Sequence, residues 1–292
     1  MLAVFCKEDP AANKKSPEEV DVPEYLAGFV RCDAASELLK YVVYNSLMAC
    51  YYLIQVDEYT IKRGKRKNTH TEKFKLEGCR FFKLDKSGLL KPLSKFASDE
   101  DIIHAGIATL KLDNQKNRWK GVCVHQHASG KKFMCGVNAI GCHYCYIREA
   151  PGGDWTIWLS AYWDKRKNRC DITDEDIRQN IKIAATELGY FGKQGIPVDN
   201  VDTRSLRSGG EMALALSGYS DTLIQKMGRW KGSFFKEYIH NYLACYSGGM
   251  YRDMRRSFGF VNISEGANED ILINVTNTMM VMDYNTGASA ES

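Results

Sequence analysis

Apolar side chains recur at helical spacing along residues 34–54, and this is the clearest periodic pattern in the chain. The positions that carry the pattern are Leu38, Leu39, Val42, Val43, Leu47, Cys50, Tyr51 and Ile54. A spacing of three, four and seven residues is typical of one face of an α-helix. We therefore expect a long, largely buried helix here.

Three shorter runs predict β-strands, at residues 78–84, 108–112 and 121–125. The residues between the last two runs are of types that suit a turn: Asp113, Asn114, Gln115 and Asn117. The pattern therefore predicts a small antiparallel sheet that contains one hairpin.

Further helices are predicted along the second half of the chain. Asp171-Ile-Thr-Asp174 has the residue types of an N-cap and opens a helix that continues through Leu188. Composition predicts helices at residues 141–147, 205–216, 221–227 and 234–243, and beyond Asn262 only an apolar stripe at 271–275 stands out. The fold class expected is α+β, mainly α-helical with a small antiparallel sheet.

Length and composition add an outline of the domains. The 292 residues divide into an N-terminal tail (1–30, with Pro10, Pro17 and Pro23), one domain (31–262) and a C-terminal tail (263–292). No secretory signal precedes the ten cysteines. The longest apolar run is too short and too polar for a membrane span, which needs about 20 residues. We expect an intracellular protein with reduced thiols and no membrane partner.

Charge and cysteine patterns each leave two interpretations. Seven basic residues fall within the 15 positions 61–75, which predicts either a solvated loop or an edge that contacts phosphates. The net charge of +4 permits a polyanionic partner without demanding one. Cys142-x-x-Cys145 has the spacing of a zinc ligand pair, but His125 and His127 make an unconvincing second pair. Ordinary half-buried thiols are favoured, and we expect no metal.

The segment that carries the most chemistry is Asp202-Thr-Arg-Ser-Leu-Arg-Ser-Gly-Gly-Glu211, followed by Met227-Gly-Arg-Trp230. Trp230 lies 23 residues after Arg207, and Tyr238 lies 8 residues after Trp230. Taken singly, these are an ion-paired helix residue, a core tryptophan and one of 16 tyrosines. Together, at fixed spacing, they are hard to obtain by chance.

This order resembles the C-terminal half of a tyrosine recombinase (phage-integrase-like) catalytic domain, and it is close to the branch found in eukaryotic retroelements. The resemblance runs from about Leu38 to about Phe260 and is most specific in its second half. It implies a tyrosine recombinase catalytic-domain fold for residues 31–262. It also implies DNA strand cleavage and rejoining through a phosphotyrosine, with no metal or nucleotide cofactor.

The resemblance assigns roles residue by residue. Arg207 matches an arginine that grips the scissile phosphate, and Trp230 matches the His/Trp position that supports it. Tyr238 matches the nucleophile, whereas Tyr242 and Tyr246 fit the spacing less well. Lys116, at the expected hairpin tip, matches the general-acid lysine, with Lys120 as the alternative.

Two positions depart from the pattern of the family. Gln55, three residues before Glu58, stands where the family has its first arginine, and Arg204 stands where it has a histidine. Gln55 removes a positive charge, and Arg204 cannot take part in proton transfer because a guanidinium stays protonated. We expect impaired catalysis on an intact fold. Family members also carry a helical DNA-clamping domain ahead of the catalytic domain, where this sequence has about 30 residues.

The function predicted is therefore that of a tyrosine recombinase or integrase, impaired in catalysis and derived from a mobile element. The alternative is a non-catalytic DNA-binding module or an inactive remnant. Double-stranded DNA is the expected partner, with self-association on DNA and a nuclear location as further expectations. The expected DNA contacts are Lys62, Arg63, Lys65, Arg66, Lys67 and Arg229.

Overall fold

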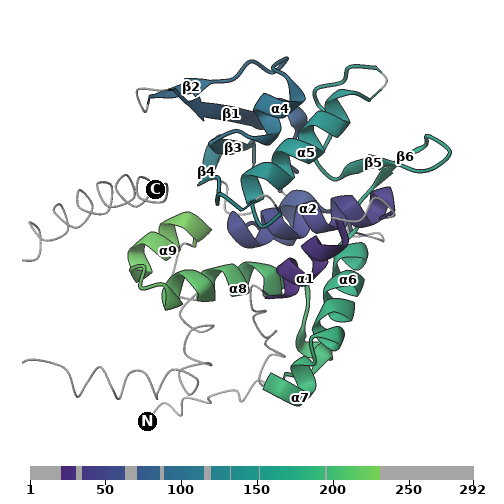
Figure 1. Ribbon diagram of the computed structural model, residues 1–292, viewed down its shortest axis with the longest axis vertical. Coiled ribbons are helices and arrows are strands. Elements are labelled where there is room, and N and C mark those ends of the chain that lie inside the picture. The colour runs from purple at the N-terminus through teal and green to yellow at the C-terminus, as the bar shows by residue number, and fades with distance from the viewer. Residues whose placement is uncertain are drawn as a thin grey trace, which may run out of the picture. The chain divides into compact units, whose positions relative to one another are not determined.

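A buried helix, α2 (Glu37–Tyr51), runs through the middle of the described structure (Figure 1). The Ser36 side chain caps its N-terminus by accepting a hydrogen bond from the Leu39 amide at 3.2 Å. The buried Asn45 amide donates to the Tyr41 carbonyl one turn earlier, at 2.8 Å. This bond satisfies one donor of the buried amide within the helix, and protein encloses α2 on several sides.

The computed structural model describes residues 21–30, 35–62, 71–85, 89–114, 120–131, 133–150, 152–194 and 196–230, all in one unit of the chain (1–241). A second unit, residues 242–292, lies outside the described residues. The helices are α1 (Asp21–Val30), α2, α3 (Val56–Tyr59), α4 (Asp99–Ile103), α5 (Gly136–Arg148), α6 (Asp174–Glu187), α7 (Tyr190–Gln194), α8 (Thr203–Leu216) and α9 (Asp221–Gly228). Two 3-10 helices are η1 (Leu76–Gly78) and η2 (Val198–Asn200). The strands are β1 (Cys79–Leu84), β2 (Leu90–Pro92), β3 (Ile107–Leu112), β4 (Val122–His127), β5 (Ala161–Trp163) and β6 (Arg169–Asp171).

The larger sheet is antiparallel throughout, with strand order β2-β1-β3-β4. β3 and β4 form a hairpin in which Thr109 lies opposite His125, and the Thr109 Oγ1 to His125 Nδ1 distance is 2.7 Å. α5 packs against both strands of this hairpin (Figure 1). The Gln126 side chain donates to the Tyr51 carbonyl at 2.8 Å and so joins the sheet to the C-terminal end of α2.

α8 lies against α2, and one glycine permits this close approach. A Cβ added at Gly210 would overlap the Cys50 carbonyl oxygen and lie 2.8 Å from a Leu53 methyl carbon. The second glycine of the Gly-Gly pair in the motif therefore has a packing role, because α2 leaves no room for a side chain there. This contact holds α8 beside the segment that follows α2.

Most elements predicted from the pattern are confirmed. The helix predicted at 34–54 is α2, and the predicted strands are β1, β3 and β4 with the expected hairpin. α5, α6, α8 and α9 match the predicted helices, with Thr173 as the N-cap of α6. The described residues thus form a mixed structure of helices and a small antiparallel sheet. The helix expected at 234–243 and the stripe at 271–275 lie outside the described residues.

The N-terminal region differs from the prediction. We expected no more than a short turn of helix before residue 30, but Asp21–Val30 forms α1, which packs against α2 and α6. Pro23 lies in the first turn of α1, where the missing amide proton has no intrahelical acceptor to lose. Val22 and Leu26 are buried on the packed face. The proline that suggested a loose tail is therefore compatible with a docked helix.

Candidate functional site

The motif residues of α8 face the segment that follows α2 across a pocket of about 370 Å³. We call it the arginine pocket, and it is lined by Ile54, Gln55, Val56, Asp57, Lys62, Thr203, Arg204, Arg207, Ser208, Glu211 and Trp230. Five of these residues are site or DNA-contact residues expected from the sequence: Gln55, Lys62, Arg204, Arg207 and Trp230. Tertiary packing brings them together from positions that span most of the described chain.

The N-terminus of α8 presents both arginines to the pocket. The Asp202 side chain caps the helix by accepting from the Thr203 amide at 2.6 Å, and the Ser205 hydroxyl accepts from the Asp202 amide at 3.0 Å. Arg204 and Arg207 lie three residues apart, which places them on one face of the helix. Arg204 is exposed, and Arg207 is half-buried. The pair can therefore reach a ligand in the pocket from one side.

Trp230 packs directly on Arg207. The Arg207 Cζ atom lies 4.3 Å from the centre of the Trp230 ring, and its Nη2 atom donates a hydrogen bond to the Gly228 carbonyl. A Cβ added at Gly228 would overlap the Trp230 ring, so only glycine permits this arrangement. The ring face attracts the guanidinium and restricts its position. Gly-Arg-Trp thus orients Arg207 toward the pocket.

Gln55 lies at the opposite wall, where it is the N-cap residue of α3. Its backbone amide donates to Glu58 Oε2 at 2.8 Å. The neighbouring Asp57 pairs with Lys62 at 2.8 Å, so the positive charge of Lys62 is partly compensated. This wall therefore supplies the neutral amide of Gln55 and the Lys62 ammonium, whose charge is partly compensated. Most of the positive charge in the pocket comes from the two arginines of α8.

The position of Arg229 corrects one expectation from the sequence. We expected Arg229 to contact DNA, but its side chain is only 3% exposed and lies 2.7 Å from Glu58 Oε2, itself 1% exposed. Its backbone adopts the left-handed conformation (φ 60°, ψ 34°) at the end of α9, which turns the side chain inward. The Arg229 charge stabilises the fold and is unavailable to a surface ligand.

Glu211 is a pocket residue that the sequence analysis did not select. It is completely buried, and neither of its carboxyl oxygens has a hydrogen-bond partner. Burial raises its pKa to about 8, against the opposing effect of the Arg207 charge. An acidic residue one turn after Arg207, in a helix of small and apolar residues, was the signal available in the sequence.

The other predicted site residues are only partly described. Lys116, Tyr238 and its alternatives Tyr242 and Tyr246 lie outside the described residues, as do Arg63, Lys65, Arg66 and Lys67. Lys120, the alternative to Lys116, is exposed just before β4. The basic segment continues in Lys73 and Lys75, whose charges are engaged by the protein: burial lowers the pKa of Lys73, and the Glu72 carboxylate raises that of Lys75.

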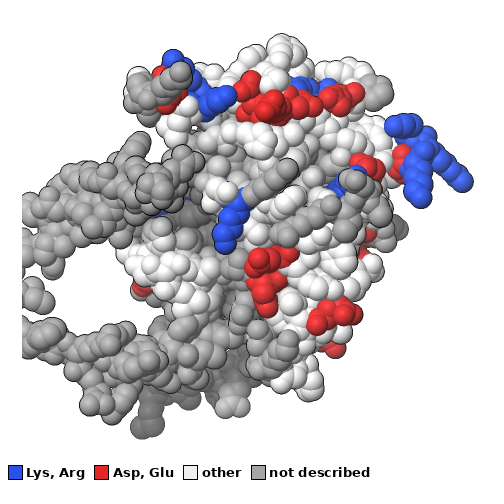
Figure 2. Space-filling view, viewed as in Figure 1, with Lys and Arg blue, Asp and Glu red and all other residues white. Residues whose placement is uncertain are grey.

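A second basic surface was also missed. β5 and β6 pair as an antiparallel hairpin, and its turn and the start of β6 carry four exposed cations within five positions, Lys165, Arg166, Lys167 and Arg169. In Figure 2 a group of blue side chains projects at the right, where Figure 1 places this hairpin. The Asp164 carboxylate accepts hydrogen bonds from the backbone amides of Arg166 and Asn168, both at 2.8 Å. These bonds hold the backbone of the turn and do not involve the cationic side chains. The run Lys-Arg-Lys-Asn-Arg was the sequence signal.

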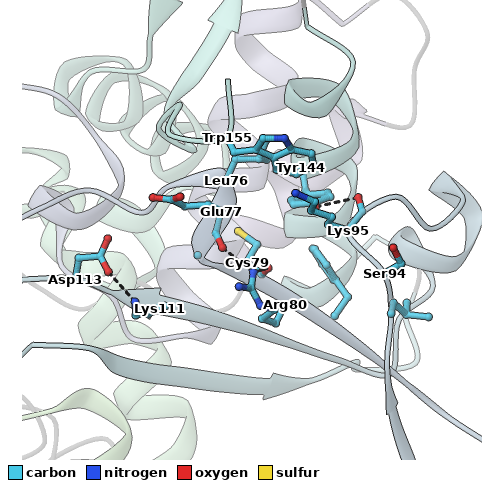
Figure 3. A pocket seen from close by; sticks show the side chains of 13 residues that line it. Leu76, Glu77, Cys79, Arg80, Ser94, Lys95, Lys111, Asp113, Tyr144 and Trp155 are labelled. Atoms are coloured by element: carbon cyan, nitrogen blue, oxygen red, sulfur yellow. Dashed lines mark hydrogen bonds and ion pairs between the residues drawn. The ribbon is translucent and has the colours of Figure 1, made fainter. Parts of the chain in front are cut away.

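A larger cavity, of about 700 Å³, lies beside η1, β1 and α5 and contains none of the predicted site residues (Figure 3). Its cations are engaged by its own walls. Arg80 donates to the Glu77 carbonyl at 2.6 Å, Lys111 pairs with Asp113 at 3.2 Å, and the Lys95 ammonium lies 4.6 Å from the centre of the Trp155 ring. In the arginine pocket the exposed Arg204 lies on the same helix face as Arg207, and such an arrangement suits an anion.

Among the described residues, no group of three His, Cys, Asp or Glu side chains is placed to hold a metal ion. His143, beside the Cys142 and Cys145 pair, is fully enclosed. Its Nε2 atom lies 3.0 Å from the Ala161 carbonyl oxygen, and its ring stacks on Tyr41. Within the described part of the chain, no helix is long and apolar enough to cross a membrane.

Comparison with known proteins finds a solved structure to which this chain aligns at a low score. No model of a known protein family matches the chain, and no curated protein sequence matches it. The integrase of the transposon Tn1549, solved in complex with transposon right-end DNA, aligns at a TM-score of 0.41 and 9% sequence identity. The alignment covers 84% of this chain and 68% of the integrase chain.

Proposed function

We propose that this protein binds double-stranded DNA and cleaves and rejoins a strand through a phosphotyrosine at Tyr238, at a strongly reduced rate. The observation that carries the proposal is the arginine pocket. Four residues assigned by the motif, Gln55, Arg204, Arg207 and Trp230, line one cavity although they come from separate parts of the chain. Independent structural residues have no reason to converge on one cavity in this way.

The pocket fits the charge distribution of phosphoryl transfer. Negative charge spreads over the non-bridging oxygens as the attacking oxygen approaches phosphorus, so positive groups positioned in advance lower the barrier. In the proposed reaction the Tyr238 oxygen forms a bond to phosphorus as the bond to the leaving DNA oxygen breaks, and the phenol proton passes to water. Arg207, held by Trp230, grips the phosphate, and Lys116 donates a proton to the leaving oxygen. Rejoining reverses each step.

The reduced rate follows from the two substituted positions. Gln55 offers an amide where the resemblance implies a guanidinium, and losing one such group costs about 10²–10³ in rate. Arg204 restores a positive charge on the opposite wall, on α8, but cannot exchange a proton. The pocket thus keeps most of its charge but has altered geometry and no histidine. DNA binding is retained more fully than cleavage.

A non-catalytic DNA-binding module is the second candidate, and the neutral Gln55 favours it. Exposed cations on the β5–β6 hairpin supply a surface for phosphate contacts in either case. The motif sequences Ser-Leu-Arg-Ser-Gly-Gly and Gly-Arg-Trp favour an origin in a eukaryotic retroelement. Self-association on DNA and a nuclear location are parts of the same proposal. Formation of a covalent protein–DNA complex separates the two candidates.

Binding of a fluorescent duplex at increasing salt tests the DNA-binding part of the proposal. Phosphate contacts release counterions, so affinity should fall steeply with salt. Arg204→Gln and Arg207→Gln should each weaken binding and lower the salt slope by about 0.9. Arg80→Gln, in the larger cavity, is the matched control and should leave both unchanged. Affinity that is independent of salt, or no binding at low salt, would overturn the proposal.

A further inference from the structure

Glu211 is an anomaly within the arginine pocket. Its side chain is completely buried, and both carboxyl oxygens lack a hydrogen-bond partner. A buried polar group without partners costs free energy, and a buried ionised carboxylate costs far more. Native proteins satisfy such groups with a bound water, ion or ligand, so Glu211 points to a polar partner in the pocket.

The position of Glu211 indicates where that partner lies. Glu211 follows Arg207 by four residues, which places the two side chains on the same face of α8 one turn apart. Both residues line the pocket, as does Ser208. An anion held by the Arg207 guanidinium therefore lies about one helical turn from the carboxyl group of Glu211.

The protonation state decides whether Glu211 can help to bind an anion. Burial raises its pKa to about 8, so the group is a neutral acid at neutral pH. The Arg207 charge opposes this shift but does not cancel it. A neutral carboxylic acid has one O–H donor, whereas the ionised form only accepts hydrogen bonds. The oxygens of a phosphodiester only accept, so they match the acid and repel the carboxylate.

Each element packed around Glu211 contributes charged or titratable groups. α8 itself carries Arg204 and Arg207, α3 carries Asp57, and the segment after α3 carries Lys62. α2 contributes Cys50, whose carbonyl oxygen lies against Gly210, α6 contributes Arg178, and the end of α9 contributes Arg229 paired with Glu58. Arg178 is bound to Asp174, Glu175 and Asp202, so it acts elsewhere. Arg207 is the charge that acts on Glu211.

We propose that Glu211 binds an oxyanion as a neutral carboxylic acid, donating its O–H hydrogen bond to an oxygen that Arg207 also holds. The inference rests on the proposed function for the identity of this oxyanion, a DNA phosphodiester. Loss of the proton removes the donor and adds a negative charge beside the ligand. Glu211 thereby makes anion binding in the pocket depend on pH near 8.

Sulfate is the most direct probe, because its charge stays constant between pH 6.5 and 9.5. Sulfate affinity of the full chain is measured from the shift in unfolding temperature at both pH values. If only the acid form binds, affinity falls tenfold per pH unit above the pKa, or about thirtyfold at pH 9.5. Glu211→Gln keeps a donor and cannot ionise, so its affinity should change less than about threefold over this range.

Two further variants complete the design. Glu211→Met keeps the volume and removes the donor, so it should bind sulfate weakly at both pH values. Glu187→Gln makes the same chemical change at an exposed position of α6 and should behave as the parent. The inference is overturned if parent and Glu211→Gln lose affinity in parallel, if Glu211→Met binds as tightly as the parent at pH 6.5, or if the parent does not bind sulfate at pH 6.5.

The same variants are then measured with a fluorescent DNA duplex at the two pH values. A parallel result, in which only the parent and Glu187→Gln weaken at pH 9.5, supports the inference for DNA. Sulfate binding with the expected pH profile but no DNA binding at low salt would overturn the proposed function and leave the role of Glu211 toward oxyanions standing. The two failures are therefore distinguishable.

Discussion

The Arg229 guanidinium lies 2.7 Å from the Glu58 carboxylate, and the pair joins the end of α9 to α3 across 171 residues of sequence. Both side chains are almost completely buried. Trp230, the next residue, packs on Arg207, so this ion pair anchors the segment that orients a pocket arginine. A structural contact thus sets the geometry of the candidate site.

Removing one partner of this pair should destabilise the protein strongly. Arg229→Met leaves the Glu58 charge buried without its partner, and such a change costs about 3–5 kcal/mol in the free energy of unfolding. The exposed pair Lys83–Asp101 is the control, where Lys83→Gln should cost less than about 1 kcal/mol. Urea unfolding measures both. A loss below about 1 kcal/mol in Arg229→Met would show that the buried pair does not hold α9 in place.

Gly210 should tolerate no side chain. Gly210→Ala places a Cβ against the Cys50 carbonyl and a Leu53 methyl group, so α8 must move away from α2. Such overpacking typically costs about 1–3 kcal/mol. Gly28→Ala, in α1, has no atom near its new Cβ and should instead stabilise by about 0.5–1 kcal/mol. Thermal unfolding of the two variants should therefore shift in opposite directions, and equal shifts would contradict the packing role.

His143 should make the protein less stable in acid. Burial holds its pKa at about 4, below its ordinary value of 6.5. The folded state therefore stays neutral while the unfolded chain takes up a proton, and stability is lost as the pH falls from 6.5 toward 4. Relative to His143→Gln, the parent should lose up to about 1.4 kcal/mol per pH unit in this window. His104→Gln, at an exposed position, should follow the parent. Identical slopes in His143→Gln and the parent would exclude this role.

Glu211 should make the protein less stable as the pH rises from 4.5 to about 8. Its pKa is raised from 4.5 to about 8, so the folded state holds a proton that the unfolded chain releases. Its contribution to stability therefore falls as the pH rises from about 4.5 to about 8, and the cost is complete above pH 8. Glu211→Gln should gain stability over the parent at pH 8 and gain much less at pH 5. Urea midpoints that differ equally at the two pH values would indicate that the carboxyl group titrates normally.

Local sequence patterns predicted most of the helices and strands. Tertiary contacts determine which side chains are buried and which line the arginine pocket. The periodicity of α2 and the N-cap of α6 act within a few residues, so the sequence reveals them. The motif spacing predicted that Arg204, Arg207 and Trp230 share a site, and all three line the arginine pocket. The burial of Arg229 could not be predicted, because its partner Glu58 is remote in sequence. Glu211 was overlooked for a similar reason, since only the packing of α2 on α8 shows that it is buried.

Formation of a covalent protein–DNA complex tests the central claim most directly. The full chain is incubated with a pool of nicked suicide duplexes, and adducts are counted on a denaturing gel. We predict a trace of adduct in the parent, none in Tyr238→Phe, and about a hundredfold more when Gln55→Arg is combined with Arg204→His. Each single change should give less than the pair. A parent that forms as much adduct as the double variant, or a double variant that forms none, would contradict the account of an impaired recombinase.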